Sequence, residues 1–528
     1  MKRAVILAAL LALAACAPAQ NQQSACTAGR VCLHFGNISD PASLDPHLIT
    51  SKNDDNIISS LFVGLMTSDP QDKPIPGMAT SWETTPDGLV WTFHLRDAAW
   101  SDGVPVTADD FVFGMRRLLD PKTAAEYAWM LYAVRGAQAV NDGKAPLNAL
   151  RVEAVDARTL RIHLLHPVPY MLELAKHMTT YPAPKHVVER YGPSWIKDHY
   201  VSNGPYMLES SRLGDRVHLV KNPRFYDAAN VCIDDVYFYP TTDSVAAERR
   251  VRRGELDLNN DIQSNRIPRL KGEIPDYVRI NLNLATTYMP LNSRVPAFRD
   301  KRVRQALSMA VDREFIAGKL LRGGQKPAYT YVPPGIANYT PPPPVWASWP
   351  FEKRQAEARR LLAAAGYGPD HPLKIEITHR NTADPSLYTP SVQADWAQIG
   401  VQASLAPQEG LIAYQSYRAR DFQVADAAWS ADYNDPKTFL DQMQSQTGSM
   451  NYGDYNNPEY DRLLAAADNE PDAIKRAAIL SKAEGIMIDD TPIIPIWFWV
   501  NKNLVNPRVT GFAENVTDNH RVRWKCKR

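Results

Sequence analysis

Strand-like and helix-like segments alternate irregularly along this chain, and this order limits the available folds more than any other feature. Alternating apolar and polar residues predict strands, whereas apolar residues four positions apart predict helices. We expect strands at residues 33–35, 91–96, 217–220, 236–239 and 493–500, and helices at 53–66, 111–119, 301–321, 353–365 and 474–488. Without an internal repeat, this order favours an α/β fold of mixed α+β lobes over a barrel or a solenoid.

Length and charge narrow the class of protein. A chain of 528 residues is long enough for two or three domains with separate cores. Its 59 basic and 58 acidic residues leave a net charge of +1, with histidine counted as neutral. Because nucleic-acid binding needs a basic surface, this balance argues against nucleic acid as the main partner.

The N-terminus reads as an export signal. A positively charged start, MKR, precedes an apolar run at 4–15 that is too short for a permanent membrane helix. We therefore predict a signal peptide at 1–15. The sequence LAAC at 13–16 resembles a bacterial lipoprotein box, which would make Cys16 the lipidated first residue of the mature protein. The alternative is ordinary cleavage near Ala14 or Ala17. Either way we expect a protein of the periplasm or cell envelope, tethered to a membrane only through such a lipid.

Four further cysteines are expected to form disulfides. An even number of cysteines in an exported chain favours disulfides over metal sites, and no CxxC pair is present. Three pairings are open. We favour Cys26–Cys32, which closes a small loop, and Cys232–Cys526, which ties a mid-chain strand to the C-terminus.

The stretch WSADYNDP at 429–436 is the strongest candidate for a binding site. It follows a strand-like run at 422–428, and its Asn-Asp-Pro sequence should stop the strand. The carboxylate of Asp432, surrounded by aromatic rings, would suit the ammonium group of a ligand, because low dielectric strengthens such a pair. The alternative is a turn aspartate that bonds its own backbone.

The familiar catalytic motifs are missing from the sequence. It contains no HExxH, GxSxG, GxxxxGK[ST] or GxGxxG, and its 12 histidines are scattered without metal-ligand spacing. We therefore expect no enzyme activity, no metal and no cofactor. An exported hydrolase with an active site assembled from distant residues remains an alternative.

Seven motifs occur in an order that resembles one protein family. They are SLDPH at 43–47, GMATSW at 77–82, WTFHLR at 91–96, WSDGVPVT at 100–107, VSNGPY at 201–206, RRGELD at 252–257 and ADYN at 431–434. This ordered set closely resembles the periplasmic oligopeptide-binding proteins of peptide ABC transporters, in the dipeptide/oligopeptide/nickel solute-binding family 5. The resemblance extends from about residue 33 to the end of the chain.

The resemblance implies a periplasmic-binding-protein type II clamshell with an extra third domain. Domain I would comprise 16–62, 185–284 and 501–528, domain II would comprise 63–184, and domain III would comprise 285–500. Two crossing strands would join domains I and III. Cys232 and Cys526 would then belong to one domain, which supports their pairing.

The resemblance also implies a monomeric receptor that delivers oligopeptides to an inner-membrane ABC permease. The peptide would lie extended between domains I and III as an added strand, so that its main chain supplies most of the bonds. Asp432 would hold its ammonium group, and Ala428 and Ser430 would pair with its backbone. The other matching positions are a pocket residue, an aromatic contact from domain II and the domain I edge: Trp429, Tyr127, Thr50 and Lys52.

Several residues of this chain differ from those at the matching positions of the oligopeptide-binding family member used for the comparison. Ala285 and Ser430 stand where it has a cysteine pair, and Asp426 stands where it has a basic residue suited to a peptide carboxyl end. A histidine and a tryptophan are replaced by Ser386 and Gly410. Only Arg418 or Arg420 could supply the missing cation, so recognition of the carboxyl end is expected to differ.

Other ligands and other classes of function remain open at this point. A murein peptide, an opine-like amine or a metal chelate could occupy the same kind of site. An exported peptide hydrolase, or a chaperone-like protein that holds unfolded chains in the cleft, would be a different class of protein.

Overall fold

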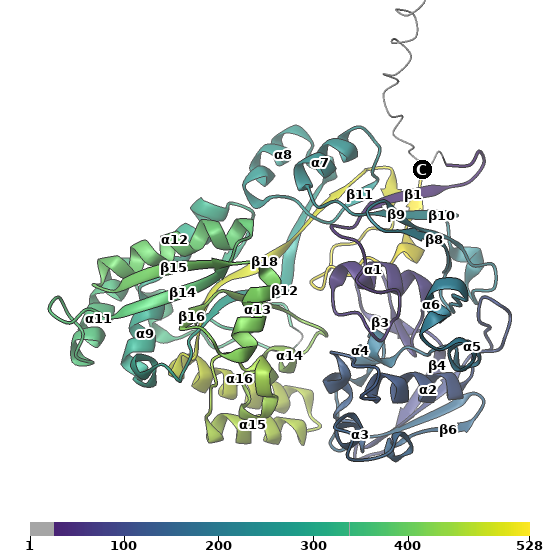
Figure 1. Cartoon of the computed structure of the whole chain (residues 1–528), viewed down its shortest axis with the longest axis horizontal. Coiled ribbons are helices and arrows are strands. Elements are labelled where there is room, and N and C mark those ends of the chain that lie inside the picture. The colour runs from purple at the N-terminus through teal and green to yellow at the C-terminus, as the bar shows by residue number, and fades with distance from the viewer. Residues whose placement is uncertain (1–25, 337) are drawn as a thin grey trace, which may run out of the picture.

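The computed structural model of the chain describes residues 26–336 and 338–528. The predicted signal peptide at 1–15 and the predicted lipidation of Cys16 lie outside these residues. The described chain forms five sheets, with helices packed around them (Figure 1). No helix in the described part has both the length and the apolar character needed to cross a lipid bilayer.

The largest sheet has nine strands drawn from both ends and the middle of the chain. Its order is β17-β12-β18-β11-β1-β10-β9-β8, and β13 pairs with β18 outside this order. Strand β1 is parallel to β10 and β11, and the other pairs are antiparallel. The strands are β1 (Cys32–Gly36), β8 (Tyr206–Arg212), β9 (Arg216–Lys221), β10 (Asp235–Tyr239), β11 (Leu258–Asn259), β12 (Val278–Pro290), β13 (Lys326–Pro327), β17 (Ala427–Ser430) and β18 (Ile493–Val505).

Strands β12 and β18 are the longest in the sheet and run between two halves of the molecule (Figure 1). We call residues 26–277 and 506–528 the first half, and residues 291–336 and 338–492 the second half. The strand predicted at 493–500 is confirmed, and it continues to Val505. Strand β12 contains position 284 and strand β18 contains position 500, the two positions at which domain boundaries are predicted. The division into domains I, II and III stays a prediction.

The first half contains a four-stranded antiparallel sheet in the order β4-β5-β7-β6. The predicted strand at 91–96 is β5, and the predicted helix at 111–119 is α2, which begins with a capping box at Thr107 and Asp110. The elements of this half, besides the strands of the large sheet, are β2 (Met66–Ser68), β3 (Pro74–Pro76), β4 (Ala79–Thr84), β5 (Val90–Leu95), β6 (Val152–Asp156), β7 (Thr159–His163), β19 (Val509–Thr510), β20 (Cys526–Lys527), α1 (Lys52–Leu61), α2 (Ala108–Leu119), α3 (Ala137–Asn141), α4 (Met171–Leu174), α5 (Lys185–Tyr191), α6 (Trp195–Asp198), α7 (Ser244–Arg252) and α8 (Ile267–Glu273).

The second half contains a three-stranded parallel sheet in the order β15-β14-β16. Helices cover this sheet, and α15 and α16 pack against each other below it in the view of Figure 1. The elements are β14 (Lys374–Arg380), β15 (Gln402–Gln408), β16 (Val424–Ala425), α9 (Lys301–Met309), α10 (Arg313–Phe315), α11 (Phe351–Ala364), α12 (Ala383–Gln398), α13 (Gly410–Ala419), α14 (Lys437–Leu440), α15 (Pro458–Asp468) and α16 (Ala473–Asp490).

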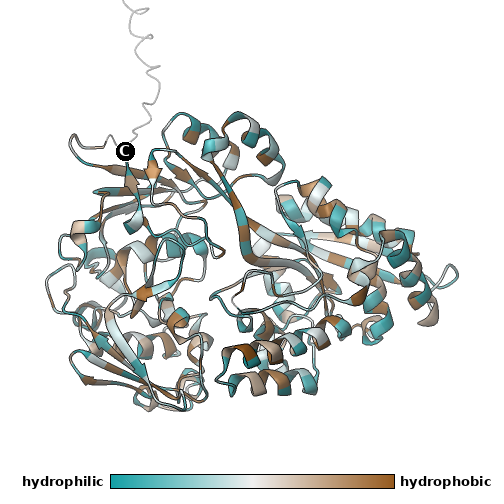
Figure 2. Ribbon diagram, turned by 180° about the vertical axis from the view of Figure 1, so that it is seen from behind, coloured by the Kyte–Doolittle hydropathy of each residue, from teal (hydrophilic) through white to brown (hydrophobic). Residues whose placement is uncertain are grey.

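Apolar side chains form four buried clusters rather than one core. The largest cluster fills the first half, and two others fill the second half. Figure 2 shows hydrophobic residues along the long central strands that connect these regions. Separate cores on either side of two strands allow the halves to fold as packed bodies with a groove between them.

Three predictions about local structure are wrong in detail. The helix predicted at 301–321 is interrupted after Met309, because Asp312 caps a new helix by accepting a hydrogen bond from the Phe315 backbone. The helix predicted at 53–66 ends at Leu61. The strand predicted at 422–428 breaks at Asp426, where the chain leaves β16 and joins the large sheet as β17.

Both favoured disulfides are present. Cys26 is bonded to Cys32, and Cys232 is bonded to Cys526 across 294 positions of sequence. The second bond ties the segment before β10 to the last strand, β20, within the first half.

Candidate functional site

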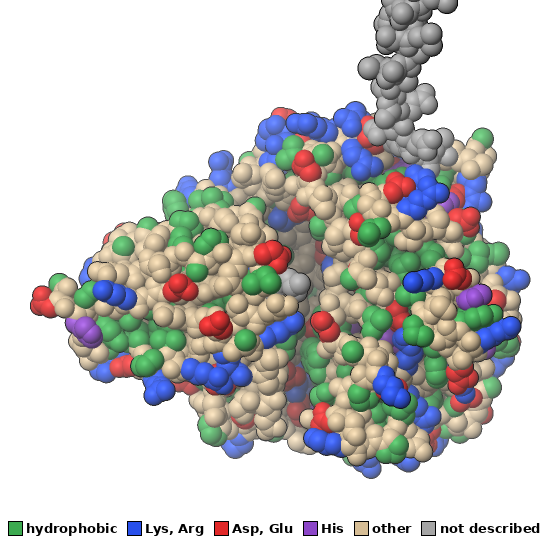
Figure 3. Space-filling model, viewed as in Figure 1, with side chains coloured by type: hydrophobic (Ala, Val, Ile, Leu, Met, Phe, Trp, Pro, Cys, Tyr) green, Lys and Arg blue, Asp and Glu red, His purple; other side chains and the backbone are tan. Residues whose placement is uncertain are grey.

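The stretch 429–433 connects the two halves of the molecule. Trp429 and Ala431 pack against a cluster of the second half, whereas Tyr433 is buried in the cluster of the first half. The ring of Tyr433 stacks on Tyr170 with centroids 4.6 Å apart. Figure 3 shows a deep groove between the two halves. The predicted binding stretch therefore lies where the halves meet.

Asp432 is a partly buried carboxylate without a cationic partner. Tyr127 Oη donates a hydrogen bond to Oδ1 at 3.0 Å, and Thr438 Oγ1 donates one to Oδ2 at 3.4 Å. Within the described residues, no lysine, arginine or histidine forms an ion pair with it. Desolvation raises the pKa of Asp432 to about 7. Because a buried charge is costly unless it is paired, this carboxylate is suited to a cation from outside the chain.

Tyr127 brings the first half into contact with Asp432. Its hydroxyl lies 3.0 Å from Asp432 Oδ1 and 3.4 Å from the carbonyl oxygen of Thr50. Trp129 and His177 pack edge-on against its ring, with centroids 6.1 and 5.7 Å away. Burial is the main cause of its raised pKa, so the phenol stays protonated and donates to Asp432. Three of the predicted site residues thus lie together.

Strand β17 presents one free backbone edge. It is the last strand of the nine-stranded sheet, and Ala431 donates its N–H to the Leu284 carbonyl on the paired side. Because successive N–H groups of a strand point to opposite sides, those of Ala428 and Ser430 point away from β12. The Ala428 N–H already meets the Tyr414 hydroxyl. Ser430 is exposed, and its register partner across the strands is Ala285.

Trp429 adds an unsatisfied donor to the same strand. Its side chain is partly buried, and its indole Nε1–H has no acceptor among the described residues. Buried donors without partners are uncommon in folded proteins. This indole is therefore a candidate donor to a ligand in the groove.

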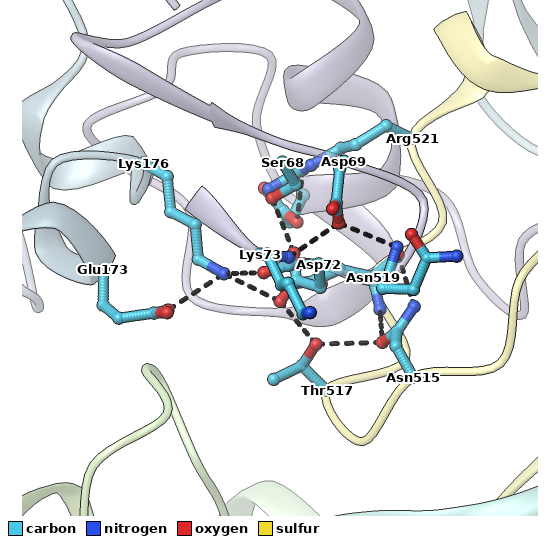
Figure 4. Close-up of polar contacts among 12 residues, drawn as sticks. Ser68, Asp69, Asp72, Lys73, Glu173, Lys176, Asn515, Thr517, Asn519 and Arg521 are labelled. Carbon is cyan, nitrogen blue, oxygen red and sulfur yellow. Dashed lines mark hydrogen bonds and ion pairs between the residues drawn. The ribbon is translucent and has the colours of Figure 1, made fainter. Parts of the chain in front are cut away.

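Lys52 is engaged with the C-terminal segment. Its Nζ bonds to Asn519 Oδ1 and lies 3.4 Å from the Thr517 carbonyl oxygen. Asn519 and Thr517 also donate to Asp72, as Figure 4 shows. The Lys52 ammonium is thus part of a polar network within the first half, and only Thr50 of this predicted edge is exposed.

The polar network around Asp72 also reaches the stretch that carries Asp432. This network was not predicted from the sequence. Lys176 Nζ lies 2.9 Å from Asp72 Oδ2 and 2.9 Å from Glu173 Oε2 (Figure 4). Glu173 in turn accepts a hydrogen bond from the backbone of Asn434. Desolvation opposes ionisation of Asp72, but the positive charge of Lys176 and further hydrogen bonds lower its pKa to about 2. These residues hold the first half against the second half.

The two arginines proposed as cationic anchors have different surroundings. Arg420 forms an ion pair with Asp454 at 3.1 Å and donates to the Gly448 carbonyl, so it stabilises a loop. Arg418 is exposed on α13. Ser386 is exposed near the start of α12, and Gly410 is the first residue of α13.

Asp426 is buried completely and is paired with an arginine that the sequence did not single out. Arg380 Nε lies 2.7 Å from Asp426 Oδ2, and Tyr388 Oη donates to Oδ1 at 2.8 Å. No strand was predicted around Arg380, and no signal in the sequence pointed to this pair. Within the described residues, no group of three or more His, Cys, Asp or Glu side chains is placed to hold a metal ion.

Comparison with known families identifies the architecture. Residues 73–451 match the family model described as bacterial extracellular solute-binding proteins, family 5 middle. The chain belongs to this family. The oligopeptide-binding protein OppA of Escherichia coli is 38% identical over 97% of this chain and 94% of its own length. The murein peptide-binding protein MppA of the same species is 37% identical over 90% of this chain and 89% of its own length.

Solved structures of the family 5 proteins share the whole fold. The E. coli MppA structure has a TM-score of 0.86 at 35% identity, covering 95% of this chain and 99% of that chain. Haemophilus influenzae OppA in complex with the peptide RPPGFSPFR has a TM-score of 0.84 at 35% identity, covering 94% and 99%. The predicted fold, the mixed α/β fold of a family 5 periplasmic binding protein, is confirmed.

Proposed function

We propose that the protein is a receptor that encloses extended oligopeptides between its two halves and delivers them to an inner-membrane ABC permease. The observation that carries this function is Asp432, a desolvated carboxylate at the groove that forms no ion pair with any described residue. A peptide supplies an α-ammonium group, which is the missing partner. The oligopeptide-binding relatives support this choice of ligand.

The free edge of β17 supports an extended binding mode. A ligand strand can bond to outward-facing backbone groups such as those of Ser430, which every peptide satisfies in the same way. Thr50 is exposed on the opposite side of the groove, next to Tyr127. In this arrangement Asp432 fixes the start of the ligand, and the main chain supplies sequence-tolerant bonds.

The remaining parts of the proposal concern location and assembly. The protein is exported to the periplasm by the signal peptide at 1–15, and Cys16 anchors it to the membrane when lipidated. It acts as a monomer without catalysis, because binding and release suffice for delivery. The domains at 16–62, 185–284 and 501–528, at 63–184 and at 285–500 are the bodies that close on the ligand.

A murein peptide is the second candidate ligand. The relative MppA binds such peptides and is nearly as similar to this chain as OppA. Asp432 accepts the ammonium group of either ligand, so the two candidates differ only in what the rest of the groove holds. The exported hydrolase has no comparable observation in its favour.

Native mass spectrometry followed by calorimetry tests the proposed function. The purified full chain should carry co-purified short peptides in one-to-one stoichiometry, and the emptied protein should bind unmodified tetrapeptides. N-acetylated versions of the same tetrapeptides should bind at least 100-fold more weakly, since they lack the ammonium group. Equal affinity for both forms would refute capture through Asp432, and peptide cleavage during incubation would favour the hydrolase.

A further inference from the structure

Arg380 lies at the edge of the sheet where ligands of such folds bind. It is the last residue of β14, and Asp426 directly follows the parallel strand β16. The Asp426 N–H donates to the Thr378 carbonyl at 2.9 Å, which fixes the two chain ends side by side. Ligands of open α/β sheets bind at the carboxyl ends of the strands. Arg380 and Asp426 occupy this edge in the second half.

Both carboxylate oxygens of Asp426 accept hydrogen bonds, whereas the Arg380 guanidinium uses only its Nε–H among the described residues. The two oxygens of Asp426 accept from Arg380 Nε and Tyr388 Oη, and its side chain has no exposed surface. Arg380 is 16% exposed, and its two Nη groups donate no hydrogen bond to any of the described residues. By contrast, the buried Arg476 uses both Nη groups on Asp435, at 2.6 and 2.9 Å.

The free end of Arg380 lies on the open side of β17. Its guanidinium carbon is 5.5 Å from the centroid of the Tyr414 ring. The Tyr414 hydroxyl meets the backbone of Ala428, whose N–H points away from β12. Arg380 therefore approaches the free edge of β17 near Ala428, which lies four residues before Asp432 in the sequence.

We propose that Arg380 binds a carboxylate of the ligand at the end of the groove opposite Asp432, and that Asp426 positions Arg380 for this contact. The proposal rests on the proposed function, because it assumes a ligand with an ammonium group on Asp432. A guanidinium offers two parallel N–H donors that match the two oxygens of a carboxylate. Asp426 holds Nε and leaves this pair of donors facing the ligand.

The other cations near the groove are less suited to this contact. Arg420 is bound to Asp454 and to backbone carbonyls, and Lys52 is bound to Asn519. Arg418 is exposed on α13, where its guanidinium already donates a hydrogen bond to the Tyr452 hydroxyl, and it has no carboxylate partner among the described residues. Arg380 combines an orientation fixed by Asp426 with Nη groups that donate to none of the described residues.

The position of Arg380 also sets a length for the ligand. Four positions separate Ala428 in β17 from Asp432, two residues beyond its end, which corresponds to at most about 13 Å at roughly 3.3 Å per extended residue. An extended peptide with its two charged ends on Asp432 and Arg380 would have roughly three or four residues. A longer peptide would have to displace the Tyr414 ring from the edge of β17.

Calorimetry with paired ligands tests the assignment. The ligands are a tetrapeptide with free ends and the same tetrapeptide with a C-terminal amide, which keeps the ammonium group but removes the carboxylate. The native protein should bind the amide 10- to 100-fold more weakly. Arg380→Gln should bind the free acid as weakly as the amide, whereas the surface variant Arg462→Gln should behave as the native protein does.

A second variant guards against misfolding. Removing Arg380 alone leaves Asp426 buried without its cation, so the double variant Arg380→Gln/Asp426→Asn removes both charges together. It should fold, bind the amide about as well as the native protein, and lose the preference for the free acid. Retained preference in this variant, or loss of preference in Arg418→Gln instead, would overturn the role of Arg380.

A third ligand identifies the source of the carboxylate. An amidated tetrapeptide that ends in glutamate carries its carboxylate on a side chain. If it regains affinity only in proteins that contain Arg380, the site accepts a side-chain carboxylate; if not, the site reads the chain terminus. Equal binding of free acid and amide by the native protein would overturn this proposal alone. Failure to bind any peptide would overturn the proposed function with it.

Discussion

Replacing Asp432 with asparagine removes one charge and changes little in shape. The carboxylate accepts from Tyr127 and Thr438 and has no cation within the described chain, so a bound ammonium would be its only counter-charge. Removing one partner of a buried ion pair typically costs about 3–5 kcal/mol. At 1.4 kcal/mol per decade, the affinity for a free-amine peptide should fall by roughly two to three orders of magnitude.

The pH dependence of binding gives an independent check. Burial raises the pKa of Asp432 to about 7 in the free protein, and an ammonium ligand would lower it again. Binding then requires loss of a proton from Asp432 below pH 7. The affinity of the native protein should therefore fall about tenfold for each pH unit from 7 to 5, until the pKa of the complex is reached. The Asp432→Asn variant should lack this slope.

The same residue should affect the stability of the ligand-free protein in the opposite direction. The folded-state pKa of about 7 lies above the ordinary value near 4, so Asp432 destabilises the fold increasingly as pH rises from about 4 to 7. At pH 8 this destabilisation is at most about 4 kcal/mol. Asp432→Asn should accordingly raise the free energy of unfolding of the empty protein at pH 8.

Isothermal titration calorimetry between pH 5 and 8, together with urea unfolding, measures all three effects. The exposed variant Asp421→Asn is the matched control and should leave affinity, pH slope and stability unchanged. Affinity of Asp432→Asn within threefold of the native value, or an unchanged pH slope, would refute the reasoning that Asp432 holds an ammonium group.

Two further predictions concern contacts that the structure shows directly. Tyr127→Phe removes the hydroxyl 3.0 Å from Asp432 and should weaken peptide binding roughly 10- to 100-fold in calorimetry. The control variant Tyr132→Phe should leave the affinity unchanged. If Tyr127→Phe causes the same loss of affinity in an Asp432→Asn background, Tyr127 acts through a contact other than Asp432. Replacing Cys232 and Cys526 with serine should lower the free energy of unfolding in urea by about 2–5 kcal/mol. Replacing the Cys26–Cys32 pair should cost less, since it closes a loop of only six positions, and equal losses would contradict the loop argument.

Much of the local structure follows from patterns within short segments. Helix α2 is predicted at 111–119 and observed at Ala108–Leu119, because its apolar spacing and its capping box lie in neighbouring residues. The break after Met309 is not foreseen, since apolar spacing continues through it and the capping role of Asp312 competes with that pattern. The division of the run at 422–428 between two sheets depends on pairing with β14 and β12, which are distant in sequence.

The candidate site divides in the same way. Asp432 is identified from its motif and from the strand that precedes it, and its neighbours Tyr127 and Thr50 through the family resemblance. In the sequence, Asp426 stands where the compared family member has a basic residue. In the structure, Asp426 binds another cation, Arg380, which lies 46 positions away. Sequence alone gives no reason to connect these two residues, because each lies at the end of its own short strand.

The sequence by itself determined the mixed α/β class and the family, and it singled out the carboxylate of the WSADYNDP stretch as the candidate site. These depend on composition, local periodicity and ordered motifs, all of which are contained in the chain. Only the tertiary structure decided that, among the described residues, Asp432 meets no cation and the two Nη groups of Arg380 meet no acceptor, and that Lys52 is engaged with Asn519. Whether a charged group is satisfied depends on which distant segments the fold brings within about 3 Å of it, and that is a property of packing rather than of sequence order.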